Sequence, residues 1–314
     1  MGELLNLRRD IATLGIAPLI ARTSADTASF DPLALLLAEV AMGNERAFAR
    51  LYELTGGRLL AIARSIVGRQ DAAEDVLQDS FLRVWRWAHR FEPGKGAAHG
   101  WLVRIVRNRA LTARAALRRR DHTHEPLDAE TMVLGEPDPA DRAMRSEEAR
   151  RVNSCLANLP ANHRRSITLV YFEGLTHSEL AERLGVQLGT AKSWVRRGLA
   201  QMNRCLTGNE LGGRELVAAE YAAGGLPAIV RRGFERRRER DARYCRAVDL
   251  WEDRLALLTE FLPDNGPAPA QVWGRIEQGL ARERIAMRRP LVWQLTSGVL
   301  ALALVALLIR LAGG

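Results

Sequence analysis

The apolar positions between Thr176 and Leu206 recur with the spacing of two short helices joined by a tight turn. Thr176 and Glu179 have the spacing of a capping box, and Gly185 is placed to end the first helix. Beyond the turn, apolar residues three or four apart give the second helix one buried stripe, formed by Ala191, Val195, Leu199 and Met202. The pattern predicts a helix-turn-helix.

The opposite face of the second predicted helix is polar and basic. It carries Thr190, Lys192, Ser193, Arg196 and Arg197. Guanidinium forks and hydroxyls near the start of such a helix suit phosphate contacts and the reading of base edges in a major groove. A solvated basic helix is the alternative. Gly198 lies inside this helix, where glycine costs about 1 kcal/mol relative to alanine, and the pattern gives no reason for it.

Helical periodicity also fills residues 31–120. Asn44 is placed to cap a helix that the pair Gly56-Gly57 weakens. Residues 71–91 follow, with acids crowded into the first turns and an apolar stripe after them, and residues 101–120 form a basic helix. The acids suit a helix N-terminus. They could also bind a metal, but no histidine lies nearby.

Three tryptophans, Trp85, Trp87 and Trp101, flank the arginines of this region. Aromatic rings beside a cationic groove suit an unpaired nucleic-acid strand, because each exposed base can stack while arginine holds phosphate. The alternative is that tryptophans belong to the core, and it holds for at least one of them.

Residues 121–149 change character. They contain nine acids and three prolines with little periodicity, and we interpret them as a linker. Residues 1–30 are interpreted as a mobile extension. Their apolar run after Arg9 superficially resembles the front of a signal peptide, but Pro18 interrupts it.

The last third of the chain ends in an uncharged run. Arginine is frequent between Arg275 and Arg289, and residues 291–309 then contain nineteen residues without a charge. As a helix they span about 28 Å, close to the roughly 30 Å hydrocarbon core of a bilayer. The sequence therefore predicts a C-terminal transmembrane helix, with the preceding segment in the cytoplasm by the positive-inside rule. A buried helix of a soluble domain is the alternative.

Composition supports a helical chain that meets a polyanion. Aromatic residues make up 6% of the chain, which argues against an all-β fold. The net charge is +9, and nearly all of the positive charge is arginine, which favours bidentate phosphate contacts.

Histidine and cysteine give no sign of an active site. The six histidines form no constellation with cysteines or acids, so no enzymatic activity, cofactor or metal is expected. Cys155, Cys205 and Cys245 lie far apart and outside any Cys-x-x-Cys motif. Their spacing argues against a disulfide framework and a zinc site, and fits a reducing cytoplasm.

Two patterns in a fixed order make a family resemblance specific. The first comprises DVLQDSFLRVW and WLVRIVRNRAL, and the second is RRSITLVYFEGLTHSELAERLGVQLGTAKSWVRRGL, with the acidic linker between them. Residues 33–206 thereby resemble extracytoplasmic-function sigma factors of the sigma-70 family. The resemblance implies a bacterial transcription initiation factor whose partners are RNA polymerase core and promoter DNA.

The resemblance also implies roles for individual side chains. The helix around Asp75 to Trp85 would dock on the polymerase clamp, through Asp75, Gln78, Asp79 and Leu82. The melted promoter strand would be held by Trp85, Trp87, Arg90, Lys95, Trp101, Arg104 and Arg107. The upstream promoter element would be read by Thr190, Lys192, Ser193, Arg196 and Arg197.

The last third carries a second resemblance. Glu215 to Pro227, Phe234 to Pro263 and Gln271 to Leu280 are similar to segments of membrane anti-sigma factors of the zinc-free kind. The similarity implies a helical domain that clamps the sigma factor within the same chain. A plain helical extension is the alternative.

The sequence as a whole predicts an all-α chain with one transmembrane helix. Its expected parts are a mobile extension (1–30), a first helical domain for polymerase and DNA (31–120), an acidic linker (121–150), a helix-turn-helix domain (151–207), an anti-sigma-like domain (208–289), and the transmembrane helix with its tail (290–314). The expected function is a sigma factor held inactive by this intramolecular partner. Residues 291–309 would anchor its cytoplasmic domains to the inner membrane. The rivals are a helix-turn-helix regulator that does not bind polymerase, and a sigma-like decoy that acts only as an interaction protein.

Overall fold

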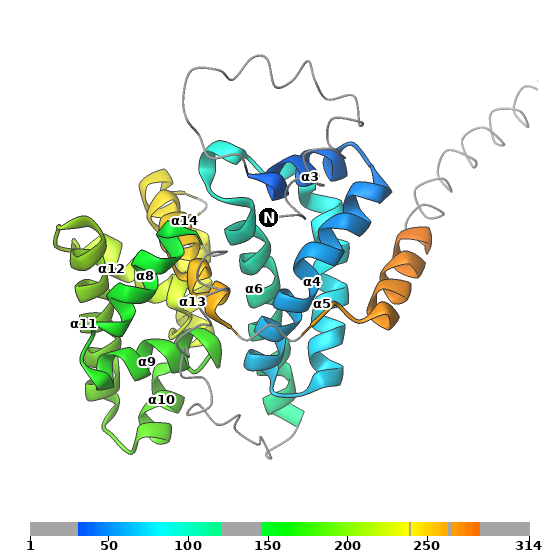
Figure 1. Ribbon diagram of the computed structural model, residues 1–314. Coiled ribbons are helices and arrows are strands. Elements are labelled where there is room, and N and C mark those ends of the chain that lie inside the picture. The colour runs from blue at the N-terminus through cyan, green and yellow to red at the C-terminus, as the bar shows by residue number, and fades with distance from the viewer. Residues whose placement is uncertain (1–30, 121–145, 239, 263–265, 283–314) are drawn as a thin grey trace, which may run out of the picture. The chain divides into compact units, whose positions relative to one another are not determined.

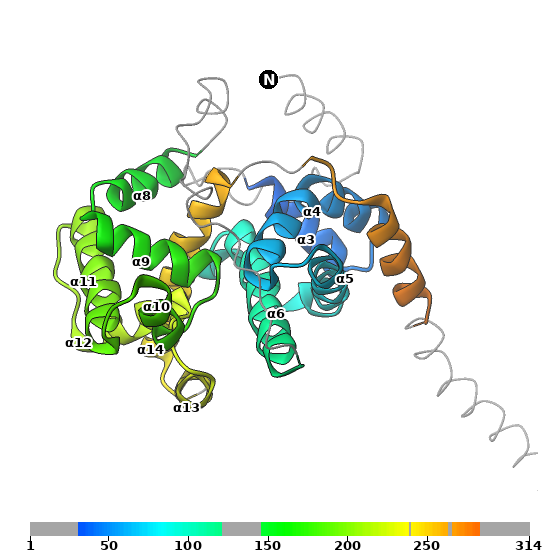
Figure 2. The same ribbon diagram turned by 90° about the horizontal axis from the view of Figure 1, so that it is seen from below.

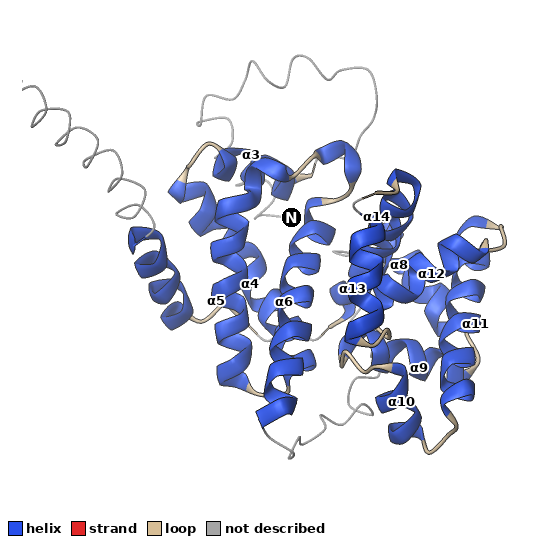
Figure 3. Cartoon of the chain, turned by 180° about the vertical axis from the view of Figure 1, so that it is seen from behind, coloured by secondary structure: helices blue, strands red, loops and turns tan. Residues whose placement is uncertain are grey.

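The computed structural model describes residues 31–120, 146–238, 240–262 and 266–282. Every regular element within these residues is a helix, which confirms the predicted helical class (Figures 1 and 3). From Leu33 on, the described residues belong to one compact unit.

The first group of helices builds a core around α4. It consists of α3 (Pro32–Ala41), α4 (Glu45–Val67), α5 (Gln70–Trp87), the short helices η1 (Ala88–Arg90) and η2 (Pro93–Lys95), and α6 (Ala98–Arg120). The Asn44 side chain accepts hydrogen bonds from the backbone N–H groups of Arg46 and Ala47, as its position predicts. Fully buried apolar side chains join α4, α5 and α6, among them Phe48, Phe81 and Leu102.

Helix α4 runs unbroken through Gly56 and Gly57, although the sequence predicts a weak point there. These glycines allow a close approach by a distant segment of the chain. A Cβ atom on Gly56 would lie 2.6 Å from the Cβ of Ala268. The Tyr52 hydroxyl donates to the carbonyl of Pro269 at 3.0 Å beside them. Tertiary packing therefore offsets the low helix propensity of the pair.

The second group contains the predicted helix-turn-helix. Its helices are α8 (Glu147–Ala157), α9 (Ala161–Phe172), α10 (His177–Leu184) and α11 (Leu188–Thr207), and α11 packs against the other three (Figure 2). The capping box of Thr176 and Glu179 is present, and Gly185 ends α10 with a positive φ of 63°. The structure also explains Gly198, because a Cβ there would lie 2.7 Å from Cδ1 of Ile167 on α9. Glycine thus lets α9 and α11 pack closely.

The last third adds further helices to the same unit. They are α12 (Gly213–Ala223), α13 (Ala228–Arg238), α14 (Ala242–Ala256), η3 (Leu257–Phe261) and a helix over residues 270–282. Helix α14 packs against both α12 and α6. Trp251, Leu255 and Ile276 are buried in the same core as Phe48 and Leu102. The last third therefore shares a hydrophobic core with the first two groups.

The predicted transmembrane helix is contradicted. In the part of the chain that the structure describes, no helix has both the length and the apolar character needed to cross a membrane. The predicted segment, residues 291–309, lies outside the described residues. The predicted location at the inner membrane is contradicted by the same finding, because both predictions relied on that one uncharged run.

Candidate nucleic-acid and polymerase interfaces

Helix α11 carries all five residues predicted to read DNA, and four of them line one hollow. Lys192, Ser193, Arg196 and Arg197 line a hollow of about 440 Å³. The predicted apolar stripe faces inward, since Ala191, Val195, Leu199 and Met202 are all fully buried. Thr190 is half-buried near the start of the helix and is not among the residues that line the hollow.

The last third of the chain also contributes to this hollow. Leu216 of α12 lines it, and Glu220 of the same helix lies 3.5 Å from the guanidinium of Arg196. Glu220 is buried, and burial raises the pKa of its carboxyl. Helix α12 thus brings an acid to the face of α11 that the sequence predicts to contact DNA.

A second hollow, of about 580 Å³, lies between α5 and α6. It contains Trp87, Arg90, Trp101 and Arg104 from the predicted set for the melted strand. The Trp87 ring has the guanidinium of Arg83 5.2 Å and that of Arg90 5.9 Å from its centroid. Arg83, Asn108 and Arg109 also line this groove, and the sequence reasoning missed them. Arg83 could have been predicted from the sequence, because it lies one helical turn before Trp87 and therefore on the same face of the helix.

The structure does not bring the rest of the predicted set into this groove. Trp85 packs into the core, with its ring centroid 5.1 Å from that of Phe48. The side chain of Lys95 lies outside the described part of the structure. Arg107 points the other way, toward α9 and α12.

Arg107 is almost completely buried, with 5% of its surface exposed. Its guanidinium donates to the carbonyls of Tyr171 at 3.1 Å and Ala222 at 2.9 Å, and also to those of Val170 and Ala223. These carbonyls lie at the C-terminal ends of α9 and α12, where a positive charge is stabilising. Burial lowers the pKa of Arg107 to about 10, so it stays charged at neutral pH. One arginine thereby joins all three groups of helices.

Acids of α14 pair with Arg104, one of the residues that line this groove. The Arg104 guanidinium lies 2.8 Å from a carboxylate oxygen of Asp249 and 3.2 Å from one of Glu252. Asp253 lies against the loop before α6 and the first turn of α6, where a Cβ on Gly96 or on Gly100 would collide with its carboxylate. Burial, more than the nearby acids, raises the pKa of Asp253 to about 7. These two glycines, one in the loop and one in α6, therefore admit a carboxylate from the same chain.

The face of α5 predicted to bind polymerase is also covered in part. The Arg275 guanidinium pairs with Asp75 at 2.9 Å and with Glu74 at 3.3 Å. Gly279 lies against Leu82, and a Cβ there would be 2.9 Å from Cδ2 of Leu82. The helix over residues 270–282 therefore reaches two of the four residues predicted to bind polymerase, Asp75 and Leu82.

The other two predicted polymerase contacts have different surroundings. Asp79 pairs with Arg109 of α6, and Gln78 is half-buried on α5. Asp79 therefore pairs with an arginine that lines the basic groove between α5 and α6.

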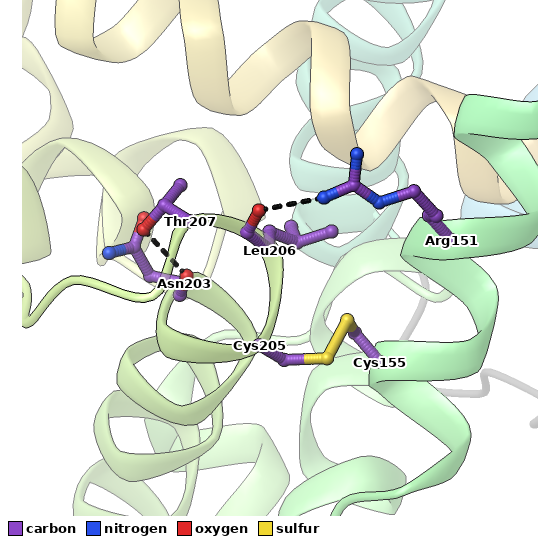
Figure 4. The surroundings of a disulfide bond; sticks show 6 residues. All are labelled: Arg151, Cys155, Asn203, Cys205, Leu206 and Thr207. Atoms are coloured by element: carbon purple, nitrogen blue, oxygen red, sulfur yellow. Dashed lines mark hydrogen bonds between the residues drawn. A yellow bond between two sulfur atoms is a disulfide. The ribbon is translucent and has the colours of Figure 1, made fainter.

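One contact corrects the prediction for the cysteines. Cys155 of α8 and Cys205 of α11 form a disulfide, with their Cα atoms 5.8 Å apart (Figure 4). Beside it, Arg151 donates to the carbonyl of Leu206 at 3.0 Å. Spacing of 50 residues gave no hint of the pair, because the helix packing that brings the two cysteines together is not visible in the sequence. Cys245 is free and half-buried.

Replacing both Cys155 and Cys205 by serine is expected to lower the free energy of unfolding by about 2–4 kcal/mol, because the bond restricts a long loop of the unfolded chain. Urea denaturation of a chain ending at Arg289, without reductant, measures the change. The control is Cys245→Ser, which closes no loop and should shift the value by less than about 0.5 kcal/mol. Equal stability of the double variant and the control would contradict a stabilising disulfide.

Comparison with known proteins gives two family matches and several relatives. Residues 51–122 match the model of sigma-70 region 2, and residues 149–202 match that of sigma-70 region 4. The ECF RNA polymerase sigma factor SigK of Mycobacterium ulcerans is 32% identical over 176 residues, which cover 56% of this chain and 94% of the relative. SigK of Mycolicibacterium vanbaalenii is 33% identical over 187 residues, covering 59% and 93%.

A solved structure of CnrH in complex with the cytosolic domain of CnrY is also similar. It shares 25% sequence identity and covers 56% of this chain and 98% of that chain, with a TM-score of 0.28. This score is too low to support conclusions about the arrangement of helices. Neither of the two family models extends past residue 202, so neither describes the last third.

Proposed function

The chain belongs to the ECF RNA polymerase sigma factors of the sigma-70 family, and we propose that its residues 208–282 inhibit the sigma factor within the same chain. The sigma factor recruits RNA polymerase to promoters and initiates transcription; it is not an enzyme. The proposal concerns the last third, which would act as an intramolecular anti-sigma domain.

One observation carries the proposal: acids of the last third pair with arginines predicted to bind promoter DNA. Glu220 lies at Arg196 on the recognition helix, and Asp249 and Glu252 lie at Arg104 in the groove between α5 and α6. A carboxylate beside such an arginine replaces the phosphate that the arginine would bind. The two sites lie in different sigma regions, so covering both would block recognition of both promoter elements.

The helix over residues 270–282 supports the same proposal at a third surface. It pairs Arg275 with Asp75, and Gln271 donates to a Glu74 carboxylate oxygen at 3.2 Å. The Trp273 ring lies 5.1 Å from that of Tyr52, so the helix is held by apolar contacts as well as by charge. Under the proposal, this helix competes with polymerase for α5.

Neutralising the three acids tests the proposal. A full chain with Glu220→Gln, Asp249→Asn and Glu252→Gln is expected to initiate transcription at least about fivefold more strongly, because couplings of this kind are typically about 1–3 kcal/mol. The measurement is promoter-directed transcription with core polymerase. The matched control neutralises three exposed acids elsewhere, Glu53, Glu147 and Glu182, and gives the same change in net charge. Equal gains in both variants would reject inhibition through these pairs.

A further inference from the structure

The segment that runs from α13 into the first turns of α14 is strongly basic. Five of its exposed arginines form no ion pair within the described part of the chain. They are Arg232, Arg236, Arg240, Arg243 and Arg246. The two described acids of this segment are engaged elsewhere, since Asp241 caps α14 and Glu235 pairs with Arg231. We call these five arginines the α13 surface.

Helix α13 adjoins the basic groove between α5 and α6. Arg231 of α13 donates to the side-chain oxygen of Asn108 at 2.6 Å, and Asn108 lines that groove together with Arg83 and Arg109. Helix α13 therefore lies beside α6 at the rim of the groove (Figure 3). Arg231 also stacks on Tyr221 of α12, 4.7 Å from the ring centroid, which holds the start of α13 in place.

The chemistry of the α13 surface selects phosphate rather than bases. Phe234, the aromatic residue of α13, packs between two tyrosines, with its ring centroid 6.4 Å from that of Tyr221 and 5.9 Å from that of Tyr244. It therefore offers no ring for base stacking. Arg232 and Arg236 lie one helical turn apart, and their guanidinium groups are suited to bidentate phosphate contacts.

An anionic lipid surface fits this face less well than nucleic acid does. Helices that lie in a membrane interface bury a broad apolar face. Among the described side chains of α13, Val230 alone is both large and apolar and also exposed. The adjoining groove, by contrast, carries Trp87 and Trp101 with arginines around them, which suits a nucleic-acid strand.

We propose that the α13 surface binds the phosphate backbone of nucleic acid without sequence preference, so that the chain keeps an affinity for DNA while its promoter-reading arginines are paired with acids. Nucleic acid in the groove would extend onto α13 past Asn108 and Arg231. This role goes beyond inhibition and does not depend on it. Under the proposal, the last third covers Arg104 and Arg196 but also supplies new cationic contacts.

The test uses the full chain and a fluorescent duplex of random sequence. Replacing Arg232, Arg236 and Arg243 by alanine should weaken binding by about tenfold to a hundredfold at low salt, and should lower the slope of log affinity against log salt by about 2 to 3, since each phosphate contact contributes about 0.9. The control replaces three exposed arginines of α4, Arg46, Arg58 and Arg64, with the same change in net charge. It should retain nearly all of the affinity and salt slope.

Two outcomes would overturn the proposal. One is an equal loss of DNA affinity in the variant of Arg232, Arg236 and Arg243 (the α13 variant) and in the control variant of α4, which would reflect net charge alone. The other concerns binding of the chain to vesicles containing phosphatidylglycerol, measured with neutral vesicles as the reference. If the α13 variant loses vesicle binding as much as DNA binding, or loses only vesicle binding, the surface is not specific for nucleic acid. Thermal melting monitored by circular dichroism establishes that both variants are folded. Neither outcome changes the expected response of the acid-neutralised chain described above.

Discussion

A chain ending at Gly208 is expected to initiate transcription from a cognate promoter about tenfold to a hundredfold more strongly than a chain ending at Arg289, which corresponds to about 1.4–2.8 kcal/mol of inhibitory free energy. The reason is that the shorter chain lacks α12, α14 and the helix over residues 270–282. Glu220 no longer faces Arg196, and the Arg104 guanidinium is no longer paired with Asp249 and Glu252. In vitro transcription with core polymerase measures the difference.

The effect should be large because the inhibitor is tethered. Only a few residues separate the end of α11 at Thr207 from the start of α12 at Gly213. A short tether gives an effective concentration of order millimolar, so that even modest affinity keeps the parts paired. Residues 209–289 added as a separate chain should restore inhibition at higher concentration. Equal activity of the Gly208 and Arg289 chains would reject the inhibitory role.

A chain ending at Leu262 separates the two inhibitory surfaces. It keeps α12 and α14 over the predicted DNA-binding residues, and it lacks the helix that pairs Arg275 with Asp75 on α5. Its activity should lie between those of the other two chains. It should also bind core polymerase more tightly than the Arg289 chain in a pull-down, because the predicted polymerase face is exposed.

Replacing Arg196 and Arg197 by alanine is expected to weaken binding of the upstream promoter element by about 1–3 kcal/mol for each bidentate base pairing that is removed. Both side chains are exposed on α11 and line its hollow together with Lys192 and Ser193. The measurement is promoter affinity of the Gly208 chain, in which α12 no longer covers this face. If one arginine touches phosphate only, its replacement should weaken binding to every sequence alike and lower the salt slope by about one.

The control for this prediction replaces Arg46 and Arg58, two exposed arginines of α4, in the same chain. It should leave the preference for the cognate promoter over a random duplex unchanged. Unchanged preference in the Arg196 and Arg197 variants as well would mean that α11 does not read the promoter.

Local patterns in the sequence predicted most of the helices. The capping box at Thr176, the cap at Asn44 and the left-handed glycine at Gly185 each depend on neighbours a few residues away. The apolar stripe of α11 follows from helical periodicity alone, and all four of its predicted members are buried. The family membership also rests on these local patterns, since the two family models match the helices that the periodicity predicted.

Where a side chain points was harder to predict, because periodicity does not distinguish among the faces of a helix that is packed on more than one side. Trp85 and Trp87 are two residues apart, yet Trp85 packs on Phe48 and Trp87 lines the basic groove. Arg104 and Arg107 are three apart, yet one meets acids of α14 and the other caps two helix ends. The tertiary contacts made by each position decided these differences.

The sequence by itself determined the helical class, the helix-turn-helix and the order of the two sigma regions, because these features depend on residues close together in the chain. The tertiary structure alone decided which acids meet which arginines, as in Glu220 with Arg196, and which cysteines pair. It also explains the glycines at positions 56, 57 and 198, where backbone or side chains from distant parts of the chain approach too closely for a Cβ atom. The physical reason is that each of these contacts joins residues far apart in the chain, and their meeting depends on how whole helices pack.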